Sequence, residues 1–210
     1  MLEFYKNENQ EINTLIKALH NVDKSYMIQN YDRNRDYYQK PERVFVAETY
    51  HQLRKLQESV FILEHLSIHV DINKDIRHSQ IDSQCIGDDF NRNRLSPDIV
   101  FHLSQNDASK ENQKLICEFK MSNTRKSLII KDLKKLIFYK ISRLQFQNAV
   151  FIFCGNSSEF ERKLNGISTE MLQCLIKNKI IVILQKEQNT NNCYNWQPYI
   201  FNLQQNTINL

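Results

Sequence analysis

Glycine is scarce in this chain, which has only Gly87, Gly155 and Gly166 among its 210 residues. The phosphate-binding patterns GxGxxG and GxxxxGKS/T need several glycines close together, because the backbone must approach the phosphate closely. The scarcity of glycine therefore argues against dinucleotide-dependent oxidoreductases and nucleotide-driven motors that use those loops.

Long apolar runs are also missing, since no stretch reaches the length of about eighteen residues that a membrane-spanning helix requires. The N-terminal segment MLEFYKNENQE is polar and acidic, whereas a signal peptide begins basic and continues apolar. We expect a cytoplasmic protein with no membrane partner.

Paired cysteine motifs are absent as well: the five cysteines, at positions 85, 117, 154, 174 and 193, lie far apart and form no CxxC pair. Neither a zinc ribbon nor a disulfide framework is indicated. We expect reduced thiols, most of them filling the core.

What the chain does contain is enough apolar material, 41% of residues, for one sizeable core and a smaller attachment. The formal net charge is +4 and the isoelectric point about 8.7. This modest excess favours polyanionic partners but does not identify a nucleic-acid-binding protein by itself.

The hydrophobic periodicity predicts helices over residues 10–28 and 41–63, and then a strand that alternates apolar and polar residues over 65–73. Two strand-like runs, 97–103 and 114–120, flank a hydrophilic turn and predict a hairpin. A helix over 128–144, a strand over 148–155, a mostly helical stretch over 157–178 and an apolar strand over 179–185 follow.

This order predicts an α/β protein with a mixed central sheet flanked by helices. We expect a helical N-terminal extension over 1–40, a core over 41–190 and a tail over 191–210 that adds a possible edge strand. Residues 73–94 are expected to form a loop.

Two carboxylates and a lysine in the predicted hairpin carry the chemistry. Asp98 follows Pro97 at the start of one strand, and Glu118 and Lys120 lie two residues apart in the next, hence on one face. If the strands are neighbours, Asp98 comes close to that face. Paired carboxylates suit a hard divalent cation, and a lysine beside them can orient water or stabilise charge on a phosphate.

The segments SPDIVF and ICEFK resemble the PD-(D/E)xK signature of the restriction-endonuclease-like nuclease superfamily, and the chain is similar to its small stand-alone bacterial members. The resemblance implies an αβββαβ core, Mg²⁺, or Mn²⁺ in its place, bound by Asp98 and Glu118, and a water-activating role for Lys120. An acidic residue of the preceding helix often completes such a site. Glu48 is the best candidate, with Glu42 and Glu58 as competitors.

We therefore expect a magnesium-dependent phosphodiesterase acting on nucleic acid, with DNA favoured over RNA and internal cleavage over cleavage from an end. A homodimer is compatible with this function, because cutting two strands needs two centres or two encounters. The alternative is a catalytically inactive module of the same fold that binds nucleic acid or protein. A third possibility is an unrelated α/β protein, in which Asp98 and Glu118 would lie on distant faces. Glu118 and Lys120 alone are also explained as a solvent-facing pair on an ordinary amphipathic strand.

Residues outside the motif supply candidate nucleic-acid contacts. Lys131, Lys135 and Tyr139 are four residues apart and share a helical stripe that can meet phosphates, although a solvated basic face balanced by Asp132 explains them equally well. Some superfamily members carry a QxxxY pattern in this helix, and here Lys135 stands at the glutamine position. Arg94 can contact phosphate at the mouth of the site.

Gln52 follows Glu48 by one helical turn and can support the site. An exposed polar residue is the simpler explanation of Gln52.

Overall fold

The computed structural model describes residues 1–6, 8–26, 41–59, 65–70, 85–86, 95–103, 109–142, 144–186 and 195–202. Its strands are β1 (Leu2–Phe4), β2 (Ser67–Val70), β3 (Ile99–His102), β4 (Gln113–Met121), β5 (Asn148–Cys154), β6 (Ile181–Lys186) and β7 (Asn195–Phe201). They form one sheet in the order β1-β7-β6-β5-β4-β3-β2, in which β4, β5 and β6 run parallel and all other neighbours antiparallel.

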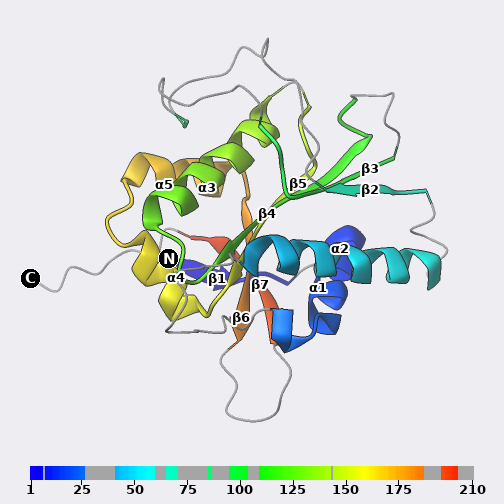
Figure 1. Ribbon diagram of the computed structural model, residues 1–210. Helices are drawn as coiled ribbons and strands as arrows, with labels where there is room; N and C mark the ends of the chain where they lie inside the picture. Colours follow the sequence, from blue (N-terminus) through cyan, green and yellow to red (C-terminus); the bar gives the residue numbers. More distant parts are fainter. Residues whose placement is uncertain are drawn as a thin grey trace, which may run out of the picture.

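Helices cover both faces of this sheet, so the predicted α/β class with a mixed sheet is confirmed. They are α1 (Gln10–Asn21), α2 (Pro41–Ser59), α3 (Lys126–Ile141), α4 (Ser157–Leu164) and α5 (Thr169–Lys177), with a short 3-10 helix, η1 (Lys24–Tyr26). In Figure 1, α3, α4 and α5 lie on one side of the sheet and α1 and α2 on the other. None of the helices that the structure describes has the length and apolar character needed to cross a membrane.

Each face of the sheet has its own hydrophobic core. Alternate residues of β4 divide between the two, because successive side chains of a strand point to opposite faces. Leu115, Cys117 and Phe119 pack with α1 and α2, whereas Ile116 packs with α3, α4 and α5. The sheet is therefore buried on both sides, as the apolar runs of β5 and β6 predict.

Capping residues place the ends of the covering helices. The Asn9 side chain accepts a hydrogen bond from Ile12 N–H at the start of α1, and Asn156 and Glu159 form a capping box at α4. At α5, Ser168 Oγ accepts from Met171 N–H. Such caps satisfy the free N–H groups of a first turn, so these boundaries are encoded locally.

The predicted hairpin is confirmed: β3 and β4 pair antiparallel, with Ile99 opposite Cys117. The strand before it is confirmed as β2, which pairs with β3.

The tail contributes a strand, β7, but this strand does not take the possible edge position expected for residues 191–210. β7 lies between β6 and β1, since residues 2–4 form an unpredicted strand that pairs with it. Within the N-terminal segment, Ile12, Leu15 and Leu19 of α1 are fully buried in the same core as α2. Trp196 N–H of β7 also donates to His20 Nε2 of α1. Both ends of the chain thus contribute to the central packing.

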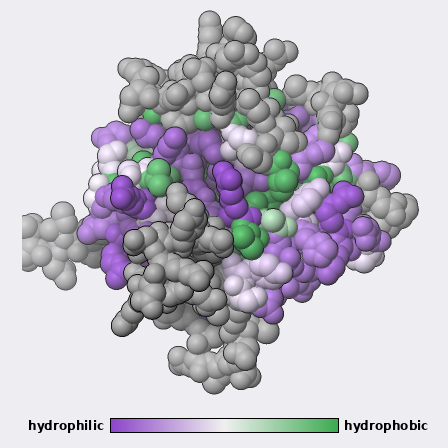
Figure 2. All heavy atoms as spheres, viewed as in Figure 1, coloured by the Kyte–Doolittle hydropathy of each residue, from purple (hydrophilic) through white to green (hydrophobic). Residues whose placement is uncertain are grey.

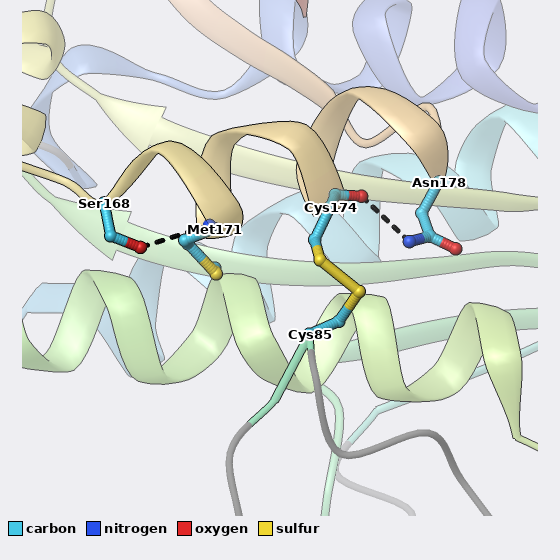
Figure 3. The surroundings of a disulfide bond; sticks show 5 residues. All are labelled: Cys85, Ser168, Met171, Cys174 and Asn178. Carbon is cyan, nitrogen blue, oxygen red and sulfur yellow. Dashed lines mark hydrogen bonds between the residues drawn. A yellow bond between two sulfur atoms is a disulfide. The ribbon is translucent and has the colours of Figure 1, made fainter.

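A disulfide joins Cys85 to Cys174 of α5, so the prediction that these two cysteines are reduced is wrong (Figure 3). They are 89 residues apart in sequence, and only tertiary packing brings them together. Ile86 beside the bond is buried in the core that includes α3 and α5. Cys117 and Cys154 are free and buried, as predicted. Cys193 and most of the predicted 73–94 loop lie outside the described residues.

Candidate functional site

Strand β4 changes character halfway along the face that α3 covers. Ile116 belongs to the apolar core, but Glu118 and Lys120, the next two residues on that face, are charged. Glu118 is 1% exposed. Because a buried charge is costly unless it is paired, the surrounding residues must compensate both groups.

Asp98 lies across the hairpin from Glu118. Its N–H donates to the Cys117 carbonyl at 3.1 Å, and its Oδ2 accepts from Phe119 N–H at 2.7 Å. Since Ile99 pairs with Cys117, continuing the antiparallel register puts Asp98 opposite Glu118, on the same face. The structure thus brings Asp98, Glu118 and Lys120 together.

Two carboxylates from different helices bind the ammonium of Lys120. Its Nζ lies 2.8 Å from Glu42 Oε1, in the first turn of α2, and 2.9 Å from Asp132 Oδ2 in α3. It also donates to the Phe119 carbonyl at 2.8 Å. Lys120 is therefore held in one position from three sides.

A second lysine, Lys135 of α3, pairs with Glu118. Its Nζ lies 2.7 Å from Glu118 Oε1 and 3.9 Å from Asp132 Oδ1, and it donates to the Ser96 carbonyl at 2.8 Å. Lys135 thereby connects α3 to β4 and to the segment just before β3. We call Glu42, Asp98, Glu118, Lys120, Asp132 and Lys135 the charged cluster.

The charged cluster holds four carboxylates and two ammonium groups, so full ionisation leaves two negative charges in excess. Burial raises the pKa of Asp98 to about 6, although Phe119 N–H and the two lysines oppose the shift. Burial and the charge of Asp98 raise the pKa of Glu118 well above its usual range, against the effect of Lys135. Negative charge at this place is thus destabilised until a further cation neutralises it.

For Lys120, in contrast to Asp98 and Glu118, the surroundings favour the charged form. Burial alone would lower the pKa of Lys120, but Asp132 and Glu42 outweigh it and raise that pKa above the usual lysine value. Lys120 therefore carries its proton at neutral pH, which fits stabilisation of negative charge and not removal of a proton.

The charged cluster fits a magnesium ion that binds the protein through two carboxylates only. Among the described residues, no three His, Cys, Asp or Glu side chains are grouped so that they could hold a metal ion. Magnesium, however, usually keeps several waters and binds through one or two carboxylates plus substrate phosphate. Asp98 and Glu118 supply two hard oxygen ligands, and the excess of two negative charges equals the charge of one such ion.

The acidic residue that α2 contributes to the cluster is Glu42, not the expected Glu48. Glu48 Oε1 accepts a hydrogen bond from Gln52 Nε2 at 2.6 Å, so these two predicted residues pair with each other. Six residues separate Glu42 from Glu48, which is about 240° around the helix and about 9 Å along it. The two glutamates therefore face different directions.

The residues predicted to contact nucleic acid lie in different environments. Lys131 is exposed, but Tyr139 is fully buried and is therefore no direct contact for a polymer. Lys135 is engaged with Glu118 inside the charged cluster. Arg94 lies outside the described residues.

Asp132 and the Ser96 carbonyl were not predicted as parts of the site. A signal for Asp132 exists: it is the one acidic residue of α3, and it precedes Leu133 on the helix side that is buried. An acid on the buried side of a lysine-rich helix needs a partner inside. No comparable signal marks Ser96, because its carbonyl acts through the backbone.

The charged cluster reaches the surface of the molecule. Glu42 is 26% exposed, and Lys120 less so. Figure 2 shows hydrophilic residues over much of the face between α3 and the start of α2. A separate groove between the end of α2 and β2, lined among others by Arg54, Glu58 and His69, contains none of the cluster residues.

Comparison with known proteins adds no relative: no protein-family model, curated protein or solved structure matches this chain.

Proposed function

We propose that this protein is a metal-dependent nuclease that hydrolyses phosphodiester bonds at the charged cluster, with DNA as the favoured substrate. The observation that carries the proposal is the convergence of Asp98, Glu118 and Lys120 on one face of the β3–β4 hairpin, within a charged cluster that as a whole has two negative charges in excess when fully ionised. The elements α2, β2, β3, β4, α3 and β5 also follow the order helix, three strands, helix, strand, which is that of a restriction-endonuclease-like core.

In this proposal, Asp98 and Glu118 hold a magnesium ion, for which manganese can substitute. The bound ion would polarise the phosphate and lower the pKa of a bound water. Hydrolysis joins the oxygen of a water molecule to phosphorus and breaks the bond to the leaving sugar oxygen, which receives a proton.

The contribution of Lys120 follows from its fixed position and its charge. Since Glu42 and Asp132 hold its ammonium and keep it protonated, it can stabilise negative charge that develops on the phosphate. Glu42 and Asp132 are then positioning residues.

The test is cleavage of duplex DNA, single-stranded DNA and RNA by the purified protein with Mg²⁺ and with EDTA. Asp98→Asn and Lys120→Met should each lower the rate by about a hundredfold to a thousandfold, since each removes charge stabilisation from the site. Glu111→Gln is the matched control, because Glu111 is exposed in the hairpin turn away from the cluster. Equal cleavage by Asp98→Asn and wild type would refute the site assignment.

A second candidate is an inactive module of the same fold that binds nucleic acid or protein. It is favoured by one observation: Lys120 and Lys135 already pair with three of the four carboxylates. Titration calorimetry with Mg²⁺ and Mn²⁺ separates the candidates, because an inactive module should bind neither ion while the nuclease binds both.

A further inference from the structure

The ammonium of Lys135 is paired with Glu118, a carboxylate that the proposed metal ion would bind. Its ammonium lies 2.7 Å from Glu118 Oε1, and its side chain is only 11% exposed. Lys120 cannot take over this role, because Glu42 and Asp132 hold it. Among the described residues, Lys135 is thus the cation paired with Glu118.

A divalent ion at Asp98 and Glu118 would meet the Lys135 ammonium at the same carboxylate. Two cations of the same sign repel each other there, so one must leave or both bind more weakly. The flexible four-carbon side chain of lysine can move its charge while the helix stays in place. Leu133 and Leu136, both fully buried, keep the backbone of α3 in place.

A hydrogen-bond donor is available to replace Lys135 at Glu118. Tyr139 lies one turn further along α3, is fully buried, and its hydroxyl has no hydrogen-bond partner among the described residues. Burial and the charges of Glu118, Asp132 and Asp98 raise the pKa of Tyr139, so its hydroxyl stays neutral and can act as a donor. A buried hydroxyl without a partner is costly, and a donor bond to Glu118 would remove that cost.

We infer that Lys135 is a switchable phosphate-binding residue: it neutralises Glu118 in the metal-free protein and turns to a substrate phosphate when a divalent ion binds. This inference rests on the proposed function, since it concerns the same metal site. It predicts that metal binding and nucleic-acid binding favour each other, because the metal ion releases the Lys135 ammonium and the nucleic acid then binds it.

The first measurement is Mg²⁺ affinity by titration calorimetry without nucleic acid. Lys135→Gln removes the competing charge and keeps groups that can hydrogen-bond to Glu118 and Ser96, so it should bind Mg²⁺ about tenfold more tightly than wild type. Lys134→Gln is the matched control: it removes the same charge from the same helix about 100° away, and should change the affinity less than twofold.

The second measurement is the affinity for a labelled DNA duplex by fluorescence anisotropy, with Ca²⁺ in place of Mg²⁺ to slow cleavage. In the wild type, Ca²⁺ should strengthen duplex binding about tenfold. In Lys135→Gln this gain should fall to about twofold, while Lys134→Gln should retain it.

A third measurement needs no variant. Acetylation of Lys135 in the wild type, followed by mass spectrometry, should become at least threefold faster when Mg²⁺ releases the ammonium, whereas acetylation of Lys134 should not change. Unchanged Mg²⁺ affinity in Lys135→Gln, or unchanged Lys135 acetylation at saturating Mg²⁺, would overturn the inference and leave the proposed nuclease standing. A wild type that binds no divalent ion would overturn both.

Discussion

Strands β4 and β5 are parallel neighbours under the same layer of helices, yet they carry opposite chemistry at matching positions. Glu118 pairs in register with Phe151, and Lys120 with Phe153. Both phenylalanines are fully buried and contact Phe160 of α4, at ring distances of 5.8 and 5.2 Å. In β4, the residues at the corresponding positions are charged, and each is paired with charged side chains of α2 or α3.

The comparison bears on why the charges are present. Replacing a buried ion pair with well-packed apolar residues is often neutral or stabilising, so the charged cluster is poorly explained as a device for stability. The β5 positions show that apolar residues fit this layer of the sheet. We propose that the β4 charges serve chemistry and not stability, and three experiments test this contrast.

The largest effect is expected from truncation in β5. Phe151→Ala should lower the free energy of unfolding by about 4 kcal/mol, because it removes a buried ring and leaves a cavity. Glu118→Gln, at the same level of the sheet, should change it by about 1 kcal/mol or less, since it takes charge from a cluster with excess negative charge. Urea unfolding of both variants measures the difference. A cost for Glu118→Gln equal to that of Phe151→Ala would make the β4 charges structural.

The next effect concerns the Cys85–Cys174 disulfide, which joins α5 to the part of the chain that precedes Asp98. Cys85→Ser should lower the free energy of unfolding by about 3 kcal/mol, because the disulfide closes a loop of 89 residues in the unfolded chain. Dithiothreitol should destabilise the wild type by a similar amount and leave Cys85→Ser unaffected. Insensitivity of the wild type to the reductant would mean that the bond is absent in solution.

The smallest effect distinguishes the charged cluster around β4 from the apolar core around β5 by the pH dependence of stability. The pKa of Asp98 is raised from 3.8 to about 6, so its contribution to stability is complete below pH 4 and is lost as pH rises through 6. The metal-free wild type should lose roughly 2 kcal/mol over this interval, after allowance for solvent screening of a partly exposed carboxylate. Lys120, Lys135 and Glu42 face the group and modulate this loss.

Asp98→Asn should flatten that part of the profile, whereas Phe151→Ala should lower the whole profile and keep its slope. Urea unfolding at closely spaced pH values with EDTA measures both. Saturating Mg²⁺ should restore stability above pH 6 in the wild type and in Phe151→Ala but not in Asp98→Asn, because the ion binds the ionised carboxylate. The same slope in Asp98→Asn and wild type would assign the pH dependence to other groups.

Much of the fold could be predicted because it depends on near neighbours in the chain. The alternation of Leu66, Ile68 and Val70 predicts β2, and the apolar residues around Leu133 predict α3. The strand Leu2–Phe4 could not be predicted, because it is only three residues long and pairs with residues 199–201 at the other end of the chain. The Cys85–Cys174 disulfide escaped prediction for the same reason.

For the site, strand alternation and a hairpin are local geometry, so the residue pattern alone predicted that Glu118 and Lys120 share a face and, for neighbouring strands, that Asp98 lies close to it. The pairing of Lys120 with Glu42 in place of Glu48, and of Lys135 with Glu118, follows from tertiary packing and could not be predicted locally. The rotation of a helix about its axis is set by packing against a sheet assembled from distant segments, and periodicity within the helix cannot specify which flank meets the charges.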